Sequence, residues 1–310
     1  MKLRVSLVFL SSIVAAVPGP WTRVADMQTA RSAHAVVSTD LGIYVLAGTG
    51  PDGRPVSSVE RFDGKTWTNE TTLPGEGLNA PAAAAIGNIV YLIGGFGTTT
   101  NRPTPAVQKY DTSTRTWSEA APLPAPRGGH AAAVLNGRVH VFGGGNSLST
   151  IDDHSVYDPN TNTWSERAKL PRRIGSSAAV VLNGKLYSIG GRSGPEDFED
   201  VHIYDPAADR WTQGPAIPAR GTSGAATLGG SIYLIGGESQ SKRAVLGDVL
   251  RLAPGASAWT HAAPMPVPRN YARAVVFKES IYVIGGSTDY GASHSSRGSM
   301  LVERFEPSAR

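Results

Sequence analysis

The sequence predicts an all-β protein, a six-bladed β-propeller, because three features recur in phase along its 310 residues. The only six tryptophans are separated by 46, 50, 47, 47 and 48 residues. Five apolar segments end in a pair of glycines, and a sixth ends in Ala47–Gly48. Alanine-rich segments precede several of them. A period of ~50 residues with these features is typical of a four-stranded blade, so we expect six blades closed into a ring.

The first residues have the pattern of a secretory signal peptide. Lys2 and Arg4 precede the apolar segment Val5–Val17, and the small residues up to Ala16 fit a cleavage site. We therefore expect a signal peptide at residues 1–16, a single propeller domain at 17–310, and a mature protein in the periplasm or outside the cell. An uncleaved anchor is the alternative. No other segment approaches the ~20 apolar residues that span a membrane.

We expect the alanine-rich segment of each blade to be its innermost strand. Residues 82–85, 131–134 and 177–180 are examples. Six strands converge at the axis of the ring, so only small side chains fit there. Tryptophan fills the wider space between blades at the periphery, so the tryptophan strand is expected outermost.

The second and third strands lie between these two in chain order. β-Branched and aromatic residues dominate the segments before the glycine pairs, and turns such as Asn136–Gly137 precede them. A Tyr-Asp pair, as in Tyr110–Asp111, marks the third strand seven residues before a tryptophan. The sixth unit ends after its third strand, whereas Trp21–Val24 has no blade of its own. We therefore expect residues 20–25 to complete the sixth blade and close the ring.

Composition excludes several classes of function. The chain has no cysteine, which excludes disulfides, cysteine-ligated metals and cysteine nucleophiles. The formal charge of +4 becomes +2 without Lys2 and Arg4 (27 basic minus 25 acidic residues), which is too small to suggest nucleic-acid binding. The seven histidines include no His-x-x-x-His pair. We expect no cofactor, no metal, no nucleic-acid partner and no membrane span, and we interpret the protein as a monomer.

Candidate binding residues lie in two sets of loops that we expect on one face, at the mouth of the axial channel. The loops that enter the innermost strands carry arginine at one repeated offset: Arg31, Arg127, Arg220 and Arg269. Such a ring would form a positive rim that binds carboxylates through the guanidinium fork. The alternative is that these are repeat residues that bond backbone carbonyls between blades.

The loops that follow the glycine pairs differ most among the blades, as functional loops usually do. They add Arg192, Asp289 and Tyr290 to the expected ligand-binding rim, with His294 in the same loop as Tyr290. The acidic residues between 196 and 200 suggest calcium binding as a further alternative.

The order Gly-Gly, Tyr-Asp, Trp and then Ala-Pro-Leu-Pro (121–124) or Ala-Pro-Met-Pro (263–266) resembles the Kelch repeat. The resemblance extends from Trp21 to Phe305. It implies a propeller fold but not one function, since Kelch propellers serve as enzymes, adaptors and lectin-like binders.

Glu238, directly after Gly236–Gly237, and Arg243 resemble the acid/base residues of periplasmic six-bladed sialic acid mutarotases (N-acetylneuraminate epimerases). That resemblance implies that Glu238 transfers protons at the anomeric centre of a sugar, while Arg243 and the arginine rim hold the sugar carboxylate. We therefore expect a propeller that binds a protein or glycan ligand through loops at the channel mouth. The alternative is a carbohydrate mutarotase or epimerase that acts on sialic acid or a related sugar.

Overall fold

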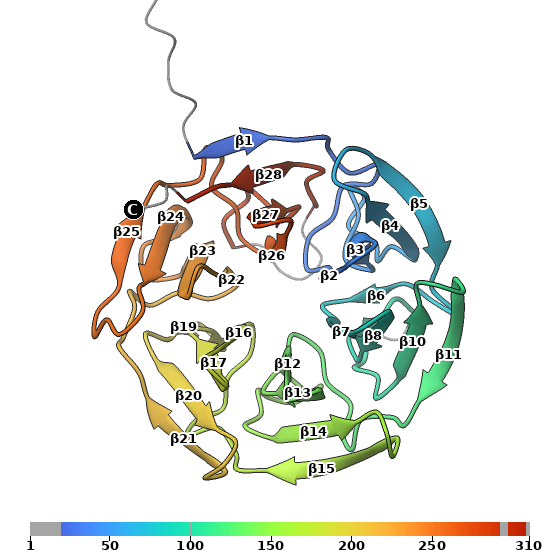
Figure 1. Ribbon diagram of the computed structural model, residues 1–310, viewed down its shortest axis with the longest axis horizontal. Helices are drawn as coiled ribbons and strands as arrows, with labels where there is room; N and C mark the ends of the chain where they lie inside the picture. Colours follow the sequence, from blue (N-terminus) through green and yellow to red (C-terminus); the bar gives the residue numbers. More distant parts are fainter. Residues whose placement is uncertain (1–19, 100, 292–296, 308–310) are drawn as a thin grey trace, which may run out of the picture.

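The computed structural model describes residues 20–99, 101–291 and 297–307, which form six four-stranded antiparallel sheets around one axis (Figure 1). Among these residues the structure contains strands and turns but no helix. The expected six-bladed, all-β propeller is therefore confirmed. The expected signal peptide, residues 1–16, lies outside the described residues.

Each blade has four strands in order from the axis to the periphery. The innermost strands are β2 (Ala35–Thr39), β7 (Ala82–Ile86), β12 (Ala131–Leu135), β16 (Ala178–Leu182), β22 (Gly224–Leu228) and β26 (Arg273–Phe277). The second strands are β3 (Gly42–Leu46), β8 (Ile89–Ile93), β13 (Arg138–Phe142), β17 (Lys185–Ile189), β23 (Ser231–Ser239) and β27 (Ser280–Ile284). The third strands are β4 (Ser58–Phe62), β10 (Val107–Asp111), β14 (His154–Asp158), β20 (Val201–Asp205), β24 (Ala244–Leu252) and β28 (Val302–Phe305). The outermost strands are β5 (Trp67–Thr72), β11 (Thr116–Ala120), β15 (Thr163–Arg167), β21 (Arg210–Gln213), β25 (Thr260–Ala262) and β1 (Trp21–Arg23).

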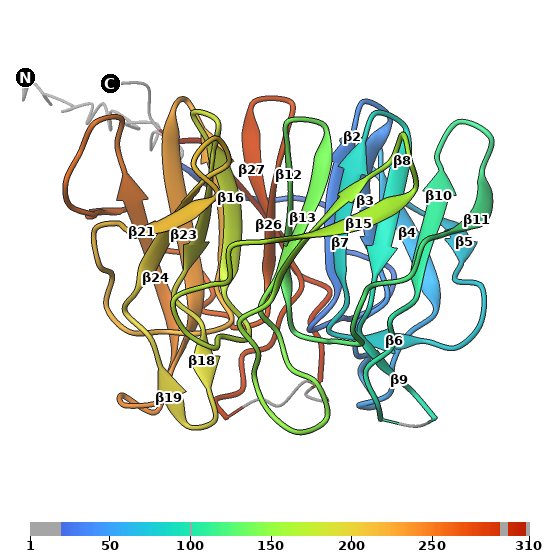
Figure 2. The ribbon, with the colours of Figure 1, turned by 90° about the horizontal axis from the view of Figure 1, so that it is seen from below.

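Two short two-stranded sheets extend the ring at one face. They pair β6 (Leu78–Asn79) with β9 (Phe96–Gly97), and β18 (Arg192–Ser193) with β19 (Glu196–Asp197). In the side view both small sheets lie at the lower edge of the ring (Figure 2).

The outermost tryptophans link each blade to the preceding one. The indole Nε1 of Trp164 donates to the carbonyl of Ala121, and that of Trp211 to the carbonyl of Ala168, both at 2.8 Å. These carbonyls follow the tryptophan strand of the preceding blade. Trp164 lies on β15 and Trp211 on β21, which are the outermost strands of their blades (Figure 1). The predicted position of tryptophan, between blades at the periphery, is therefore confirmed.

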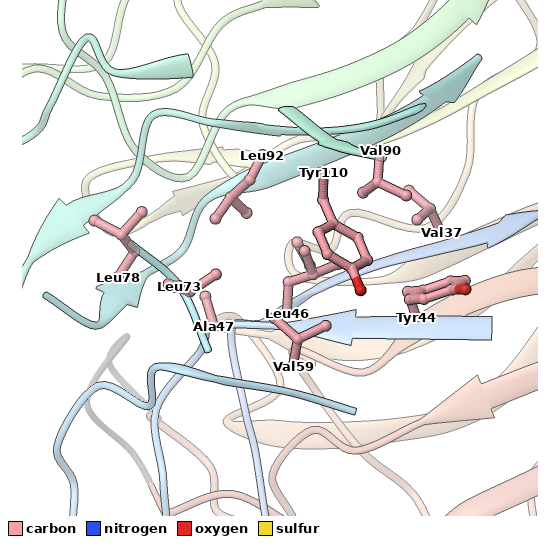
Figure 3. Close-up of a cluster of buried hydrophobic side chains, with 11 residues drawn as sticks. Val37, Tyr44, Leu46, Ala47, Val59, Leu73, Leu78, Val90, Leu92 and Tyr110 are labelled. Carbon is pink, nitrogen blue, oxygen red and sulfur yellow. The ribbon is translucent and has the colours of Figure 1, made fainter. Parts of the chain in front are cut away.

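Apolar side chains between neighbouring blades form the core. Figure 3 shows the cluster between the first and second blades, which includes Tyr44 and Leu46 of β3 and Val90 and Leu92 of β8. All four are between 0% and 1% exposed. Full burial of one such side chain stabilises the fold by ~1.5–3 kcal/mol. Because the ring is closed, every blade has interfaces of this kind on both sides.

The N-terminal strand closes the ring as predicted. β1 pairs with β28 in antiparallel register, with Trp21 opposite Phe305 and Arg23 opposite Glu303. β1 lies outside β28 in the sixth blade (Figure 1). The blade nearest the C-terminus is therefore completed by the strand nearest the N-terminus.

A histidine pair replaces apolar packing in the third blade. His140 occupies the second-strand position where the other blades have tyrosine, and its Nδ1 lies 3.0 Å from Nε2 of His154. Burial lowers the pKa of His140 to about 3 and that of His154 to about 4. In each case desolvation of the imidazolium is the largest cause. Both rings are therefore neutral in the folded protein at pH 7.

We expect the change His140→Tyr to reduce the acid sensitivity of the fold. The unfolded chain binds a proton at this histidine near pH 6.5 but the folded chain only near pH 3, so stability falls as the pH decreases between these values. The wild type should lose ~2 kcal/mol more than the variant between pH 7.5 and pH 5. A cavity of about 250 Å³ beside His140 leaves room for the larger ring.

Denaturant unfolding at the two pH values measures this difference. The reverse change at the equivalent position of the fourth blade, Tyr187→His, should add a dependence of the same sign. Equal pH dependence of wild type and His140→Tyr would contradict the assignment.

Candidate functional site

Two sets of loops meet on one face of the ring, which we call the loop face. In each blade the residue after the repeated arginine position pairs with the residue after the glycine pair. The six pairs are Ser32 with Thr49, Asn79 with Phe96, Gly128 with Gly145, Gly175 with Arg192, Gly221 with Glu238, and Asn270 with Ser287. The expectation that both loop sets share a face is therefore confirmed.

The four repeated arginines lie beneath the loop face. Arg31, Arg127, Arg220 and Arg269 are between 0% and 2% exposed. Arg31 donates from Nη1 to the carbonyls of Ala47 (2.9 Å) and Ser58 (2.7 Å), and its Nη2 lies 2.9 Å from Oε1 of Glu60. Burial lowers the pKa of Arg31, and the contact with Glu60 opposes that effect.

The other three arginines are also buried and bond other groups of the protein. Arg220 forms a bidentate pair with Asp248, with distances of 2.8 and 2.9 Å. Nη2 of Arg269 lies 2.8 Å from Oε2 of Glu303, and Nη1 of Arg127 donates to the carbonyl of Gly143 at 3.3 Å. The expected exposed rim of these four arginines is therefore corrected. Arg31 and Arg127 bond carbonyls of their own blade, and not carbonyls between blades as the alternative had it. Arg31, Arg220 and Arg269 bond a carboxylate of the third strand of their blade.

Glu238 is the centre of a polar cluster that joins three blades. Its side chain is 1% exposed. Oε1 accepts a hydrogen bond from Arg192 Nη1 at 3.0 Å, while Oε2 accepts from Asn270 Nδ2 at 2.7 Å and from the amide of Gly291 at 2.9 Å. These donors come from the fourth and sixth blades, so the carboxylate of the fifth blade fixes the loops on either side of it.

Arg192 completes this cluster. Its Nε donates to Oδ1 of Asp197 at 3.0 Å, and Oδ2 of Asp197 accepts from the amide of Gln240 at 2.6 Å. Its Nη2 is buried and has no hydrogen-bond partner. The guanidinium lies against Gly221, where a Cβ would meet Nε at 2.6 Å, so only glycine leaves room for it. The cluster is therefore rigid and retains one donor without an acceptor.

Arg243 and Tyr290 lie at the exposed edge of the same region. Arg243 stands at the turn between β23 and β24, and its guanidinium lies 5.8 Å from the centroid of the Tyr290 ring. Tyr290 is 38% exposed. Asp289 is exposed, and its carbonyl accepts from Asn270 at 3.0 Å. Within the described residues, no hydrogen bond or ion pair joins Arg243 to Glu238, so the structure does not bring these two side chains into contact.

Three of the four acidic residues between 196 and 200 are paired with arginines. Arg172 lies 2.6 Å from Asp200 and 3.7 Å from Glu196, while Asp197 belongs to the cluster of Glu238. In the part of the chain that the structure describes, no group of three or more histidine, aspartate or glutamate residues could hold a metal ion. His294 lies outside that part. No described helix is long and apolar enough to cross a membrane.

Comparison with known proteins agrees with the geometry. A family model described as the KLHDC2/KLHL20/DRC7 Kelch-repeats domain matches residues 21–169 and 82–286. The chain belongs to the Kelch-repeat family.

Known Kelch proteins resemble this chain over part of its length. Alpha-scruin of Limulus polyphemus is 33% identical over 129 residues, which are 40% of this chain and 14% of that protein. The Kelch repeat-containing protein At3g27220 of Arabidopsis thaliana is 32% identical over 144 residues, 44% of this chain and 34% of that protein. The solved structure of YjhT superposes with a TM-score of 0.75 at 18% identity and covers 86% of this chain and 93% of that chain. The chain thus spans less than half of alpha-scruin and of the Arabidopsis protein. The likeness to YjhT shows the fold alone.

Sequence reasoning missed Asn270, which bonds Glu238 in this Kelch propeller. A signal was present, because Asn79 occupies the same repeat position in the second blade. Its Nδ2 donates to Thr49 Oγ1 at 2.8 Å, which is the equivalent link between the first and second blades. An asparagine after the repeated arginine position therefore indicates a bond to the preceding blade.

Proposed function

We propose that this Kelch propeller binds a protein or glycan ligand on the loop face, over its fourth, fifth and sixth blades. One observation carries the proposal: Glu238 accepts hydrogen bonds from Arg192, Asn270 and the amide of Gly291. Loops of three blades are thereby held in one arrangement before any ligand arrives. Preorganised loops lose less entropy on binding, which favours affinity.

The exposed residues above this cluster suit ligand contact. Arg243 and Tyr290 are of the types that contribute most to binding energy at interfaces. In the adjacent third blade, Leu148 is 93% exposed and offers an apolar contact. Arg243 and Tyr290 thus replace the four buried arginines as the expected contact residues.

A carbohydrate mutarotase is the second candidate, as the resemblance of Glu238 and Arg243 suggests. Its support is the position of a buried carboxylate at the loop face, beside the unpartnered Nη2 of Arg192. Proton transfer by Glu238 would require a substrate hydroxyl to replace one of its three protein donors. The occupied carboxylate therefore favours the binding function.

We further propose that residues 1–16 direct secretion, so that the propeller acts as a monomer in the periplasm or outside the cell. The motif of Lys2 and Arg4 before the apolar segment supports this location.

Substitutions at the loop face distinguish the two functions. Arg243→Ala and Tyr290→Ala should each weaken binding ~10-fold without lowering the melting temperature, because both side chains lie at the surface. Ligands are sought on glycan arrays and by affinity capture. The full chain is expressed, and the mass of the secreted product tests both cleavage after Ala16 and the monomeric state.

The mutarotase is tested by the rate at which sialic acid anomers equilibrate, followed by NMR. Under the binding function, this rate equals the buffer value for wild type and for Glu238→Gln alike. A rate enhancement that Glu238→Gln abolishes would establish the enzyme instead. Binding that neither Arg243→Ala nor Tyr290→Ala weakens would refute the contact surface.

A further inference from the structure

The axial channel contains a cavity of about 110 Å³ between the six innermost strands. All six strands surround this axis (Figure 1). Small side chains from every blade line the cavity, including Ala83, Ala132, Ala179, Ala225 and Ala274. No acidic residue lines it. It is thus a narrow space lined by small side chains and by backbone groups.

One arginine interrupts this pattern. Arg273 is the first residue of β26 and lines the cavity. The first residue of the innermost strand in the other blades is Ala35, Ala82, Ala131, Ala178 or Gly224. The side chain of one blade therefore adds a single positive charge to the channel.

Arg273 is half-buried and lacks the counterion that the four buried arginines have. Its Nε donates to the carbonyl of His34 at 3.0 Å, and among the described residues no carboxylate pairs with it. Desolvation lowers the pKa of Arg273. A guanidinium that faces a cavity and has no carboxylate partner can bind an anion from solution.

His130 also lines the cavity, but its ring nitrogens do not face it. The residue is 5% exposed and both nitrogens are buried. Desolvation and the charges of Arg127 and Arg273 lower its pKa to about 3, so the ring is neutral at pH 7 and adds no charge to the cavity. Arg273 is therefore the residue of the lining that suits an oxyanion, because its guanidinium forms charge-assisted hydrogen bonds.

The cavity is separate from the loop face. Tyr271, two residues before Arg273, is 5% exposed and clusters with Ala33 and Ala80. Backbone bonds circle the axis at this level, including those from Ala80 N to Ala33 O and from Tyr271 N to Thr222 O. A large ligand on the loop face therefore does not share the cavity, whereas a group of a few heavy atoms fits a space of this volume.

We propose that the axial cavity binds a small oxyanion, a free carboxylate or phosphate, as the counterion of Arg273. The anion would neutralise Arg273, the one charged side chain among the described residues that line this cavity. The proposal is independent of ligand binding on the loop face.

Thermal unfolding of the full chain at constant ionic strength tests the site, with sodium acetate or sodium phosphate replacing sodium chloride. The melting temperature of the wild type should rise saturably with one of these anions, since a ligand of the folded state stabilises it by mass action. The response should fall at least ~10-fold in Arg273→Ala, which introduces the residue found in four other blades. Arg54→Ala, in an exposed loop, is the matched control and should respond like the wild type.

A second readout separates a bound anion from a loss of structure. In chloride alone, Arg273→Ala should melt no lower than the wild type, because it removes a cation that has no carboxylate partner. Comparison of the melting temperatures in acetate and in phosphate shows which oxyanion is bound. Equal responses of wild type and Arg273→Ala, or no response of the wild type to either anion, would overturn the proposal.

Discussion

Deletion of residues 1–28 should lower the melting temperature by ~10 °C relative to a chain that lacks only residues 1–16, because it removes the strand that closes the ring. β1 pairs with β28 at three positions from Trp21 to Arg23. The indole of Trp21 stacks on Phe305 with ring centroids 4.6 Å apart, and its Nε1 donates to the carbonyl of Ala263 at 2.9 Å. One residue thus contacts both the sixth blade and the turn that follows the fifth.

The size of the effect follows from the groups removed. Loss of a large aromatic anchor costs ~3–5 kcal/mol, and 1 kcal/mol corresponds to ~2–4 °C in a domain of this size class. The deletion also removes Met27, which is 2% exposed, and leaves the edge of β28 without a partner. Unpaired edges promote association between chains, so the shorter protein should also aggregate at lower concentration.

Calorimetry on the two truncated chains and on Trp21→Ala measures this contribution. We expect the melting temperature of Trp21→Ala to lie between those of the two truncated chains. This variant keeps the backbone pairing of β1 with β28 but loses the indole side chain. Equal melting temperatures of the two truncated chains would show that the ring is stable without β1.

The fold was predictable because the constraint on each strand is geometric and acts on every blade. Alanine fits where β7 and β12 approach the axis, and tryptophan fits where Trp164 and Trp211 bridge neighbouring blades. Such constraints repeat with the blade, so one sequence shows them six times. The closure by β1 was also predictable, because the last repeat lacks a fourth strand and the first residues of the propeller supply one.

The site was less predictable because its partners do not repeat. Arg31 and Arg220 share one repeat position, but Glu60 lies 29 residues after the first and Asp248 lies 28 residues after the second. Their spacing varies with loop length, so sequence alone could not distinguish a buried pair from an exposed rim. The position of Arg273 in the channel could not be predicted for the same reason. It replaces alanine in one blade only, so the repeat does not mark it.

Arg31→Met should lower the free energy of unfolding by ~3–5 kcal/mol, because Arg31 is a buried member of an ion pair. Arg31 and Glu60 are both 0% exposed, and Arg31 also donates to the carbonyls of Ala47 and Ser58. Removal of the guanidinium leaves a buried carboxylate without its charge partner and two carbonyls without a donor. Methionine fills much of the volume, so lost charge and hydrogen bonds dominate the cost.

Glu60 also accepts hydrogen bonds from two backbone amides, so a double variant of Arg31 and Glu60 is informative. Its Oε2 accepts from the amide of Gln28 at 2.6 Å, and its Oε1 from the amide of Thr29 at 3.0 Å. Arg31→Met with Glu60→Leu removes the unpaired charge but leaves both amides without an acceptor. Denaturant unfolding should therefore show that the second change recovers only part of the lost stability. A structural role for Arg31 requires that Arg31→Met lower the stability. If the variant instead unfolded like the wild type and lost ligand binding, Arg31 would be a ligand-contact residue.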